Sequence, residues 1–322
     1  MGLVGTFRSS GSYGNFGDIK NIREDINMKI GLFDIDSKYH NLALMKISAY
    51  HKQKGDEVEF YNPLWHFTYD TIYCSKIFRK SHKNDGYIRE GMICGGSGGF
   101  GYLTLLPEYI EHLKPDYSLY NLNYSLGFTT RGCIRNCKFC IVREKEGYIK
   151  EHSEVEEFLN PKSNVIVLLD NNFLALPSHI KKLQKYIKRG WQMDFNQGLD
   201  IRLINGENAK LLAGVKHLKR IHFAWDLISY EKEFKEGLNI ILRAGIKPYR
   251  IMVFVLCGFN TTFEEDLYRF NELLNLGVDP FIMIYGNVDR RLKEFARWVN
   301  KRLYKFCEWE DFIKWRGGEC VM

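Results

Sequence analysis

The sequence predicts an α/β protein built from parallel sheets, in two domains that follow one another along the chain. Short runs rich in β-branched and aromatic residues alternate with segments in which apolar residues recur at helical spacing, which is typical of parallel strands joined by helices. The chain has 322 residues, of which 45% are hydrophobic, enough for two separate cores. We expect a flexible leader over residues 1–27, a Rossmann-like domain over 28–118, a partial (β/α)6 barrel of the TIM type over 119–290 and a helical tail over 291–322.

The leader is predicted to be flexible because residues 1–27 are rich in Gly and Ser and show no periodicity. The first domain then begins with a buried strand over 28–36 and a helix over 42–55, which ends at Gly55. Three further β-prone runs follow, at residues 58–61, 71–74 and 87–94. Strands that alternate with polar or helical pieces in this way predict a Rossmann-like or flavodoxin-like sheet.

The barrel is predicted because strand and helix alternate six times from residue 124 onward. The expected strands cover residues 124–129, 164–169, 193–201, 220–225, 249–256 and 281–285. Each ends in polar residues or glycine, and the C-terminal ends of barrel strands are where the sites of such proteins lie. One intervening helix is expected from Ser178 to Gly190, and Thr262 with Glu265 forms a capping box for another. Apolar residues at helical spacing predict an amphipathic helix in the tail.

The net charge of +7 permits a nucleic-acid partner without indicating one, because no nucleic-acid-binding motif is recognisable. No apolar run approaches the roughly 20 residues needed to cross a bilayer, and no secretory leader is evident. We therefore expect a cytoplasmic location and no membrane partner. The eight cysteines, three of them crowded into one loop, look like metal ligands in a reducing compartment rather than a disulfide framework.

Three cysteines stand close together, Cys133, Cys137 and Cys140, with no fourth nearby. A closed zinc site or an electron-carrying iron-sulfur cluster uses four protein ligands, so three thiolates leave one position of a [4Fe-4S] cube open. The gaps of three and two residues let one short loop reach three corners, with Gly132 allowing close backbone approach and Phe139 supplying an apolar wall. A zinc site would need a second cysteine pair, and a thioredoxin-like pair would leave Cys133 unexplained.

This loop, Cys-x3-Cys-x2-Cys with an aromatic residue before the last cysteine, resembles the cluster loop of the radical S-adenosylmethionine (SAM) enzymes. In that family three cysteines bind a [4Fe-4S] cluster, and SAM occupies the open iron. Reductive cleavage of SAM then gives a 5′-deoxyadenosyl radical that abstracts hydrogen from the substrate. The resemblance implies an enzyme with an unidentified substrate that needs the cluster, SAM and a reductant such as flavodoxin or ferredoxin.

The resemblance also implies that polar residues at several strand ends contact SAM. The candidates are Phe139, Asn172, Gln197, Arg202 and Asp226. The run Asp170-Asn171-Asn172 stands where the family often has Gly-Gly-Glu, which puts the contact to the SAM amino group in doubt. Arg202 is a fixed cation that would pair with the SAM carboxylate, or else with a neighbouring acid of the chain itself.

The first domain resembles the cobalamin-binding-type domain that often precedes a radical SAM barrel, through Ser75 and the pair Gly95-Gly96. The Asp-x-His-x-x-Gly that ligates cobalt is absent, so cobalamin is not expected, and His40 is a cobalt-ligand candidate or an ordinary loop histidine. A methyl- or methylthiotransferase acting on tRNA or protein is an alternative in the same class, although methylthiotransferases carry a second cysteine triplet in the first domain. An iron-sulfur binding or electron-transfer module without radical catalysis is the alternative from another class.

Overall fold

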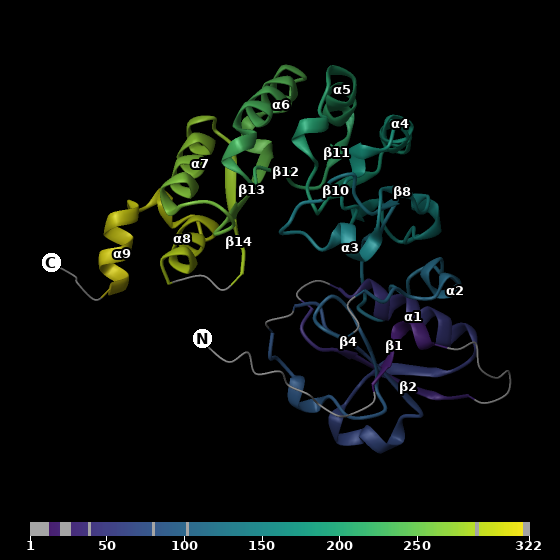
Figure 1. The fold of residues 1–322 in the computed structure, drawn as a ribbon. Helices are drawn as coiled ribbons and strands as arrows, with labels where there is room; N and C mark the ends of the chain where they lie inside the picture. Colours follow the sequence, from purple (N-terminus) through teal and green to yellow (C-terminus); the bar gives the residue numbers. More distant parts are fainter. Residues whose placement is uncertain are drawn as a thin grey trace. The chain divides into compact units, whose positions relative to one another are not determined.

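The computed structural model describes residues 13–19, 27–37, 40–78, 81–100, 103–286 and 290–317. The chain divides into two compact units, which are described separately (Figure 1). The first comprises the chain as far as Leu126 together with Glu154–Asn160, and the second comprises Gly127–Ser153 and the chain from Pro161 onward. The boundary thus lies later than the expected residue 118. The segment Glu154–Asn160 joins the first unit because the buried Asn160 hydrogen-bonds to the Leu122 carbonyl and the Ser125 hydroxyl.

The first unit contains a five-stranded parallel sheet, with the order β1-β5-β4-β2-β3. The strands are β1 Gly14–Asn15, β2 Lys29–Asp34, β3 Glu57–Phe60, β4 Thr71–Ser75 and β5 Ile93–Gly95. The helices are α1 Leu42–Gln53 and α2 Glu108–Glu111, with 3-10 turns at Phe16–Asp18, Pro63–Thr68, Asp85–Tyr87 and Val155–Glu157. Leu44 and Ile47 of α1 pack on Ile30 and Leu32 of β2. The predicted parallel α/β organisation is confirmed, although β5 is shorter than the run predicted over 87–94.

Part of the expected leader belongs to this fold. β1 pairs with β5, and Phe16, which is 2% exposed, lies in the same core as Ile30. A Cβ atom on Gly95 would lie 2.2 Å from the Phe16 ring, so the glycine makes room for the buried aromatic side chain. The prediction of a flexible leader is therefore wrong for residues 13–19, because burial of one aromatic ring orders the chain there. Residues 1–12 and 20–26 lie outside the described residues.

Two cysteines of the first unit form a disulfide bond. Cys74 of β4 and Cys94 of β5 stand directly opposite one another in the parallel register, with 4.6 Å between their Cα atoms. That separation lies within the range that a disulfide can bridge. The expectation of cysteines without disulfide bonds is therefore wrong for this pair.

The second unit contains two parallel sheets, with the orders β11-β10-β9-β6 and β12-β13-β14. Six strands lie where the sequence predicts them: β6 Ser125–Gly127, β9 Val165–Leu168, β10 Gln192–Phe195, β12 Ile221–Ala224, β13 Ile251–Cys257 and β14 Asp279–Ile284. β10 ends earlier than expected because the chain turns at Gly198, whose φ is +84°. A parallel bridge between Leu199 and Phe223 links the chain after β10 to β12. The remaining strands are β11 Lys216–His217 and the antiparallel pair β7 Thr130–Arg131 and β8 Lys150–Glu151.

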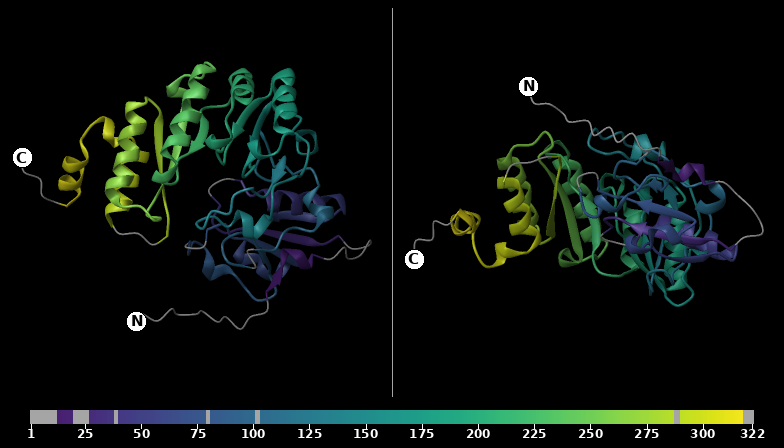
Figure 2. Two further views of the ribbon diagram at one scale, coloured as in Figure 1. Left: turned by 45° about the horizontal axis from the view of Figure 1, so that its top comes forward. Right: turned by 90° about the horizontal axis from the view of Figure 1, so that it is seen from below.

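The helices of the second unit follow these strands in sequence. They are α3 Val142–Glu146, α4 His179–Arg189, α5 Gly206–Gly214, α6 Glu231–Arg243, α7 Phe263–Asn275, α8 Arg290–Asn300 and α9 Trp309–Gly317. The 3-10 turns are Phe173–Ala175, Ile201–Leu203, Ile228–Tyr230, Pro248–Arg250 and Leu303–Lys305. Neighbouring helices α4, α5 and α6 lie side by side along the strands (Figures 1 and 2). The predicted end of α4 at Gly190 and the capping box of Thr262 and Glu265 are confirmed.

The expected helical tail is part of the second unit. α8 packs against β14 and buries Phe295 and Val299, so the predicted amphipathic helix is confirmed as far as Asn300. Trp298, expected on the polar side, is buried, and Phe306, expected on the apolar side, is exposed. Asn300 at the end of α8 hydrogen-bonds both the N–H and the carbonyl of Ile282 in β14. None of the helices in the described part of the chain is long and apolar enough to cross a lipid bilayer.

Candidate functional site

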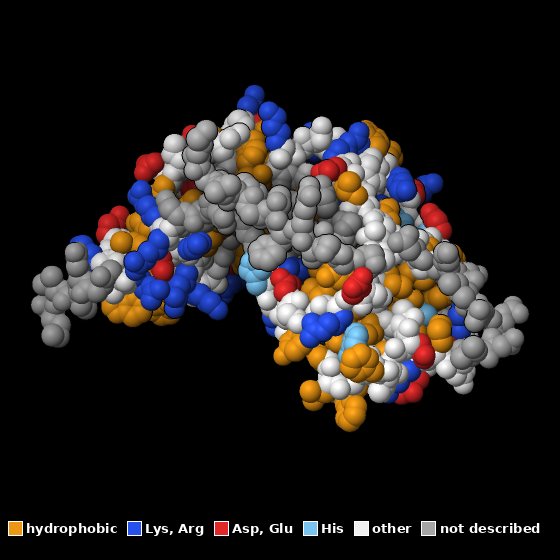
Figure 3. Space-filling view, turned by 60° about the horizontal axis from the view of Figure 1, so that its bottom comes forward, with side chains coloured by type: hydrophobic (Ala, Val, Ile, Leu, Met, Phe, Trp, Pro, Cys, Tyr) orange, Lys and Arg blue, Asp and Glu red, His pale blue; other side chains and the backbone are white. Residues whose placement is uncertain are grey.

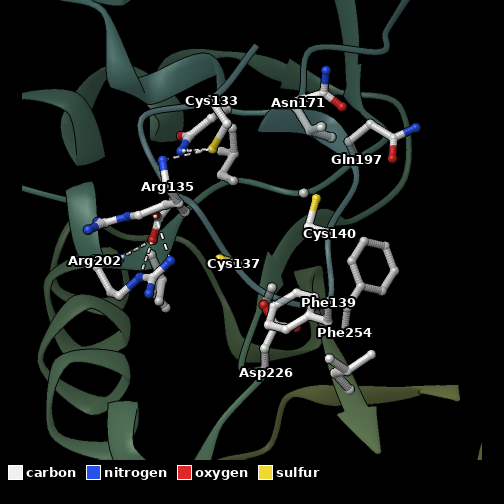
Figure 4. A pocket seen from close by; sticks show the side chains of 18 of the residues that line it. Cys133, Arg135, Cys137, Phe139, Cys140, Asn171, Gln197, Arg202, Asp226 and Phe254 are labelled. Carbon is white, nitrogen blue, oxygen red and sulfur yellow. Dashed lines mark hydrogen bonds and ion pairs between the residues drawn. The ribbon is translucent and has the colours of Figure 1, made fainter. Parts of the chain in front are cut away.

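A pocket of about 410 Å³ lies in the second unit, a volume within the range of roughly 300–1,000 Å³ that is usual for small-molecule sites. It is lined by the cysteine loop and by residues that follow or end β9, β10, β12 and β13 (Figure 4). All eight residues singled out from the sequence line this pocket: Cys133, Cys137, Phe139, Cys140, Asn172, Gln197, Arg202 and Asp226. Residues far apart in the chain meet there because the C-terminal ends of neighbouring parallel strands lie at one edge of a sheet.

Two carboxylates, those of Asp170 and Glu146, hold the start of the cysteine loop in place. The buried carboxylate of Asp170 accepts hydrogen bonds from the backbone and the hydroxyl groups of Thr129 and Thr130, at 2.7–2.9 Å. Burial raises the pKa of Asp170, and these bonds lower it in part. On the other side, the Glu146 carboxylate of α3 accepts from the Gly132 N–H at 3.1 Å and from the Asn171 amide at 2.7 Å. These contacts fix the start of the loop to the end of β9.

The three thiols of the loop are free and border the pocket. The Cys140 N–H donates to the Cys137 carbonyl at 3.0 Å, which closes a tight turn. Cys133 Sγ accepts from the Arg135 N–H and from the Asn172 amide, each at 3.3 Å. Burial raises the pKa of the Cys137 and Cys140 thiols, so they are protonated near neutral pH unless a metal displaces the protons.

The cysteine loop offers three sulfur donors to a metal. In the part of the chain that the structure describes, no three side chains of His, Cys, Asp and Glu are grouped to hold a metal ion. The loop offers three thiols, with two N–H donors to sulfur and the apolar ring of Phe139 beside them, and such neighbours tune thiolate-bound iron-sulfur clusters. Soft sulfur ligands favour such a cluster over a hard cation such as magnesium or calcium. The donor types of the loop thus suit a [4Fe-4S] cluster with three protein ligands, although the described side chains are not gathered around a common centre in this structure.

Arg202 takes part in an ion-pair network beside the thiols. Its guanidinium donates twice to Asp200, at 2.7 and 3.1 Å, and Asp200 also accepts from Arg135 at 3.0 Å (Figure 4). Burial alone would raise the pKa of Asp200, but its bonds to Arg202 and the charge of Arg135 hold it below its ordinary value. Of the two interpretations of Arg202 from the sequence, the structure shows the second, in which it pairs with a neighbouring acid of the chain. Because two guanidinium groups share one carboxylate, this side of the pocket keeps a positive charge.

Asp226 lies at the end of β12, on another side of the pocket from the network. Burial raises the pKa of its carboxyl to about 6, although the charges of Arg202 and Arg269 oppose the shift. Gln197 and Asn172 also border the pocket, and Asn172 Oδ1 is buried without a hydrogen-bond partner in the described residues. These groups could accept or donate hydrogen bonds to a polar ligand.

Sequence reasoning missed several residues of the pocket. Arg135 and Asp200 were not predicted, although the position of Arg135 between two of the cysteines could have revealed it. The apolar wall formed by Phe254 and Met283 was also missed. Every residue of β13 is apolar, so the sequence alone does not show which of its side chains face the pocket.

The candidates of the first unit make contacts within the chain. His40 Nδ1 lies 2.6 Å from the Tyr124 hydroxyl, which agrees with the interpretation of His40 as a loop histidine with a local partner. Ser75 is buried and accepts from the Asn41 amide at 2.8 Å. A Cβ atom on Gly96 would lie 2.2 Å from the Lys76 carbonyl oxygen, so this glycine is required by the backbone of the chain itself.

Replacing Gly132 with alanine is expected to reduce the free energy of unfolding by about 1 to 3 kcal/mol and to impair iron binding. Its φ is +79°, and a Cβ atom would lie 2.5 Å from the Tyr148 carbonyl oxygen, so the cysteine loop would have to shift. Urea unfolding and iron content measure the two effects. Gly206→Ala is the control, because Gly206 has open space around it, and an equal loss in both variants would contradict the prediction.

Replacing Asp226 with asparagine is expected to change how the stability of the apoprotein depends on pH. With a pKa of about 6 when folded and about 3.9 when unfolded, wild-type Asp226 makes the folded state bind the proton more tightly. Wild-type stability therefore falls as the pH rises from about 4 to about 6, and Asp226→Asn should be about 3 kcal/mol more stable than wild type at neutral pH. Urea unfolding across this range measures the difference. Parallel pH profiles for both proteins would contradict the prediction.

Comparison of the sequence with known protein families and with curated proteins finds no match to either. Function must therefore be inferred from the pocket itself. Its distinguishing features are three free thiols on one short loop and polar side chains from the ends of several parallel strands.

Proposed function

We propose that this protein is a radical SAM enzyme in which Cys133, Cys137 and Cys140 bind a [4Fe-4S] cluster and the adjoining pocket binds SAM. One observation supports the proposal above all: the three free thiols and the polar ends of the neighbouring strands border one pocket. When bound, the cluster and SAM would supply the 5′-deoxyadenosyl radical for hydrogen abstraction from a substrate.

In this proposal two N–H groups would support Cys133 as a ligand of the cluster. The Arg135 N–H and the Asn172 amide both donate to Cys133 Sγ, and hydrogen bonds to ligand sulfur influence the reduction potential of a cluster. Phe139 borders the same pocket and packs against Phe259, with 5.2 Å between the ring centroids. This aromatic pair would provide an apolar wall beside the thiols.

The other residues of the pocket would bind and orient SAM. Arg202 and Arg135, with one carboxylate between them, offer donors to the SAM carboxylate. Asp226 would accept hydrogen bonds from hydroxyl or amino groups, and Gln197 and Asn172 would bind polar atoms through their amides. Except for that of Arg135, each of these roles extends the interpretation of the same residues from the sequence.

The proposal also covers the fold type of each unit, the electron donor and the location of the protein. We interpret the first unit as a Rossmann-like domain that resembles cobalamin-binding modules, and the second as a partial (β/α)6 barrel of the TIM type. Parallel pairing and the order of the main strands support this interpretation. A reductant such as flavodoxin or ferredoxin would supply the electron, and a cytoplasmic location is part of the same proposal.

The test is SAM cleavage by the reconstituted protein. The full chain is incubated anaerobically with iron and sulfide, and then with SAM and dithionite. Formation of 5′-deoxyadenosine that depends on both the reductant and the reconstituted protein would support the proposal. Cluster assembly without 5′-deoxyadenosine would indicate an electron-transfer module instead, and stoichiometric zinc without iron would overturn the proposal.

A further inference from the structure

We propose that the surface formed by α8 and the turn after it binds the phosphate backbone of a single-stranded nucleic acid. Residues 290–306 contain seven basic residues and one acidic residue, a net charge of +6, whereas the whole chain carries +7. This short segment of the second unit is thus strongly basic, and three acids, Glu308, Glu310 and Asp311, follow it. Such a concentration is the electrostatic footprint expected of a polyanion site.

The cations of this segment lie on one exposed face. Lys293, Arg297 and Lys301 follow one another at intervals of four residues, which places them in a row along the helix, and all three are exposed. Figure 3 shows Lys and Arg side chains gathered on the part of the second unit that carries α8. We call Lys293, Arg297, Lys301 and the exposed Lys305 the α8 basic row.

Two of the acids near the row, Glu294 and Asp279, are paired with other residues. Glu294 binds Arg316 at 2.9 Å, and Asp279 binds Arg220 at 2.6 Å and Arg302 at 2.9 Å. Within the described ranges, no member of the α8 basic row forms an ion pair with a carboxylate at 4.0 Å or less. The positive charges of the α8 basic row are therefore available to an anionic partner.

The neighbouring side chains favour a nucleic acid over a lipid surface. The apolar residues of α8 are buried against the second unit, so the helix has no apolar face to insert into a membrane. Phe306, directly after Lys305, is 85% exposed. The Trp298 indole donates to the Cys307 carbonyl at 3.1 Å and so fixes the turn that carries Phe306. Cations beside an exposed aromatic ring are the combination that single-stranded nucleic acids require, because bases stack on the ring.

The test is binding of fluorescently labelled 20-nucleotide RNA and DNA strands to the full chain, followed by fluorescence anisotropy at several salt concentrations. Four phosphate contacts predict a slope of log K against log salt of about −3. The variant Lys293→Gln/Arg297→Gln/Lys301→Gln should bind about 100-fold more weakly at 0.1 M salt, with a slope of about −1. Phe306→Ala should weaken binding about tenfold without changing the slope. Tighter binding to one of the two strands identifies whether RNA or DNA is the nucleic acid that the surface binds.

A matched control removes three exposed charges elsewhere on the second unit, in Lys181→Gln/Lys188→Gln/Lys210→Gln on α4 and α5, and should bind like the wild type. Circular dichroism confirms that each variant is folded. Equal binding by the wild type and the α8 variant, or an equal loss in the control, would overturn the proposal. Binding to phosphatidylserine vesicles but to neither oligonucleotide would also overturn it. Because SAM and reductant are absent from the assay, the result is independent of the proposed radical chemistry.

Discussion

Replacing Cys133, Cys137 and Cys140 together with alanine is expected to abolish iron and sulfide binding and, with it, all formation of 5′-deoxyadenosine from SAM. The three thiols are free, share one loop and border one pocket, and thiolates hold such clusters. Chemical analysis of the reconstituted protein should fall from about four iron and four sulfide per chain to none. Chromatography of the SAM reaction measures the loss of activity.

The control for this variant is Cys307→Ala. Cys307 is a free cysteine of the same unit that does not line the pocket, so its loss should leave iron content and SAM cleavage unchanged. Iron retained in the triple variant would show that the cluster is bound elsewhere. Iron lost equally in Cys307→Ala would show that general damage, rather than ligand removal, explains the result.

Replacing Arg269 with leucine is expected to reduce the free energy of unfolding by about 3 to 5 kcal/mol, the usual cost of leaving one charge of a buried pair without its partner. Arg269 is fully buried on α7 and forms an ion pair with Asp266. It also donates at 2.7 Å to the carbonyls of Trp225 and Leu256, at the ends of β12 and β13. The variant would leave Asp266 as a buried carboxylate and two carbonyls without their donor. Urea unfolding measures the loss.

Two further variants separate the buried pair from a general effect of losing charge. Arg291→Leu removes an exposed ion pair with Glu264 in the same unit and should cost less than about 1 kcal/mol. Asp266→Leu/Arg269→Leu should be more stable than Arg269→Leu alone, because no carboxylate is then left buried. Equal losses in Arg269→Leu and Arg291→Leu would contradict this account of the buried pair.

The candidate site could be predicted largely because parallel strands bring their C-terminal ends together. Cys133, Asn172 and Asp226 follow different strands, and a polar residue at each strand end is visible in the sequence. The pairing of Arg202 with Asp200 and Arg135 could not be predicted with the same certainty. A long guanidinium side chain chooses among nearby acids according to loop geometry, which local patterns do not specify.

Other features depended on contacts between distant segments. Residues 13–19 are ordered because Phe16 packs into the space that Gly95 leaves. Nothing in the sequence of the leader indicates that Gly95 is the residue Phe16 packs against. The disulfide between Cys74 and Cys94 depends on the parallel register of β4 and β5, which places the two residues opposite one another. Periodicity predicts that a strand exists, but the neighbouring strand and its register are set by the packing of the whole sheet.

The central claim, that three thiols of this chain hold a cluster with one position left for SAM, is tested most directly by electron paramagnetic resonance. The reconstituted protein is reduced with dithionite, and its spectrum is recorded with and without SAM. We predict the signal of a reduced [4Fe-4S] cluster that changes in shape when SAM is added, because SAM would bind the open iron. A spectrum that is identical with and without saturating SAM would contradict the claim.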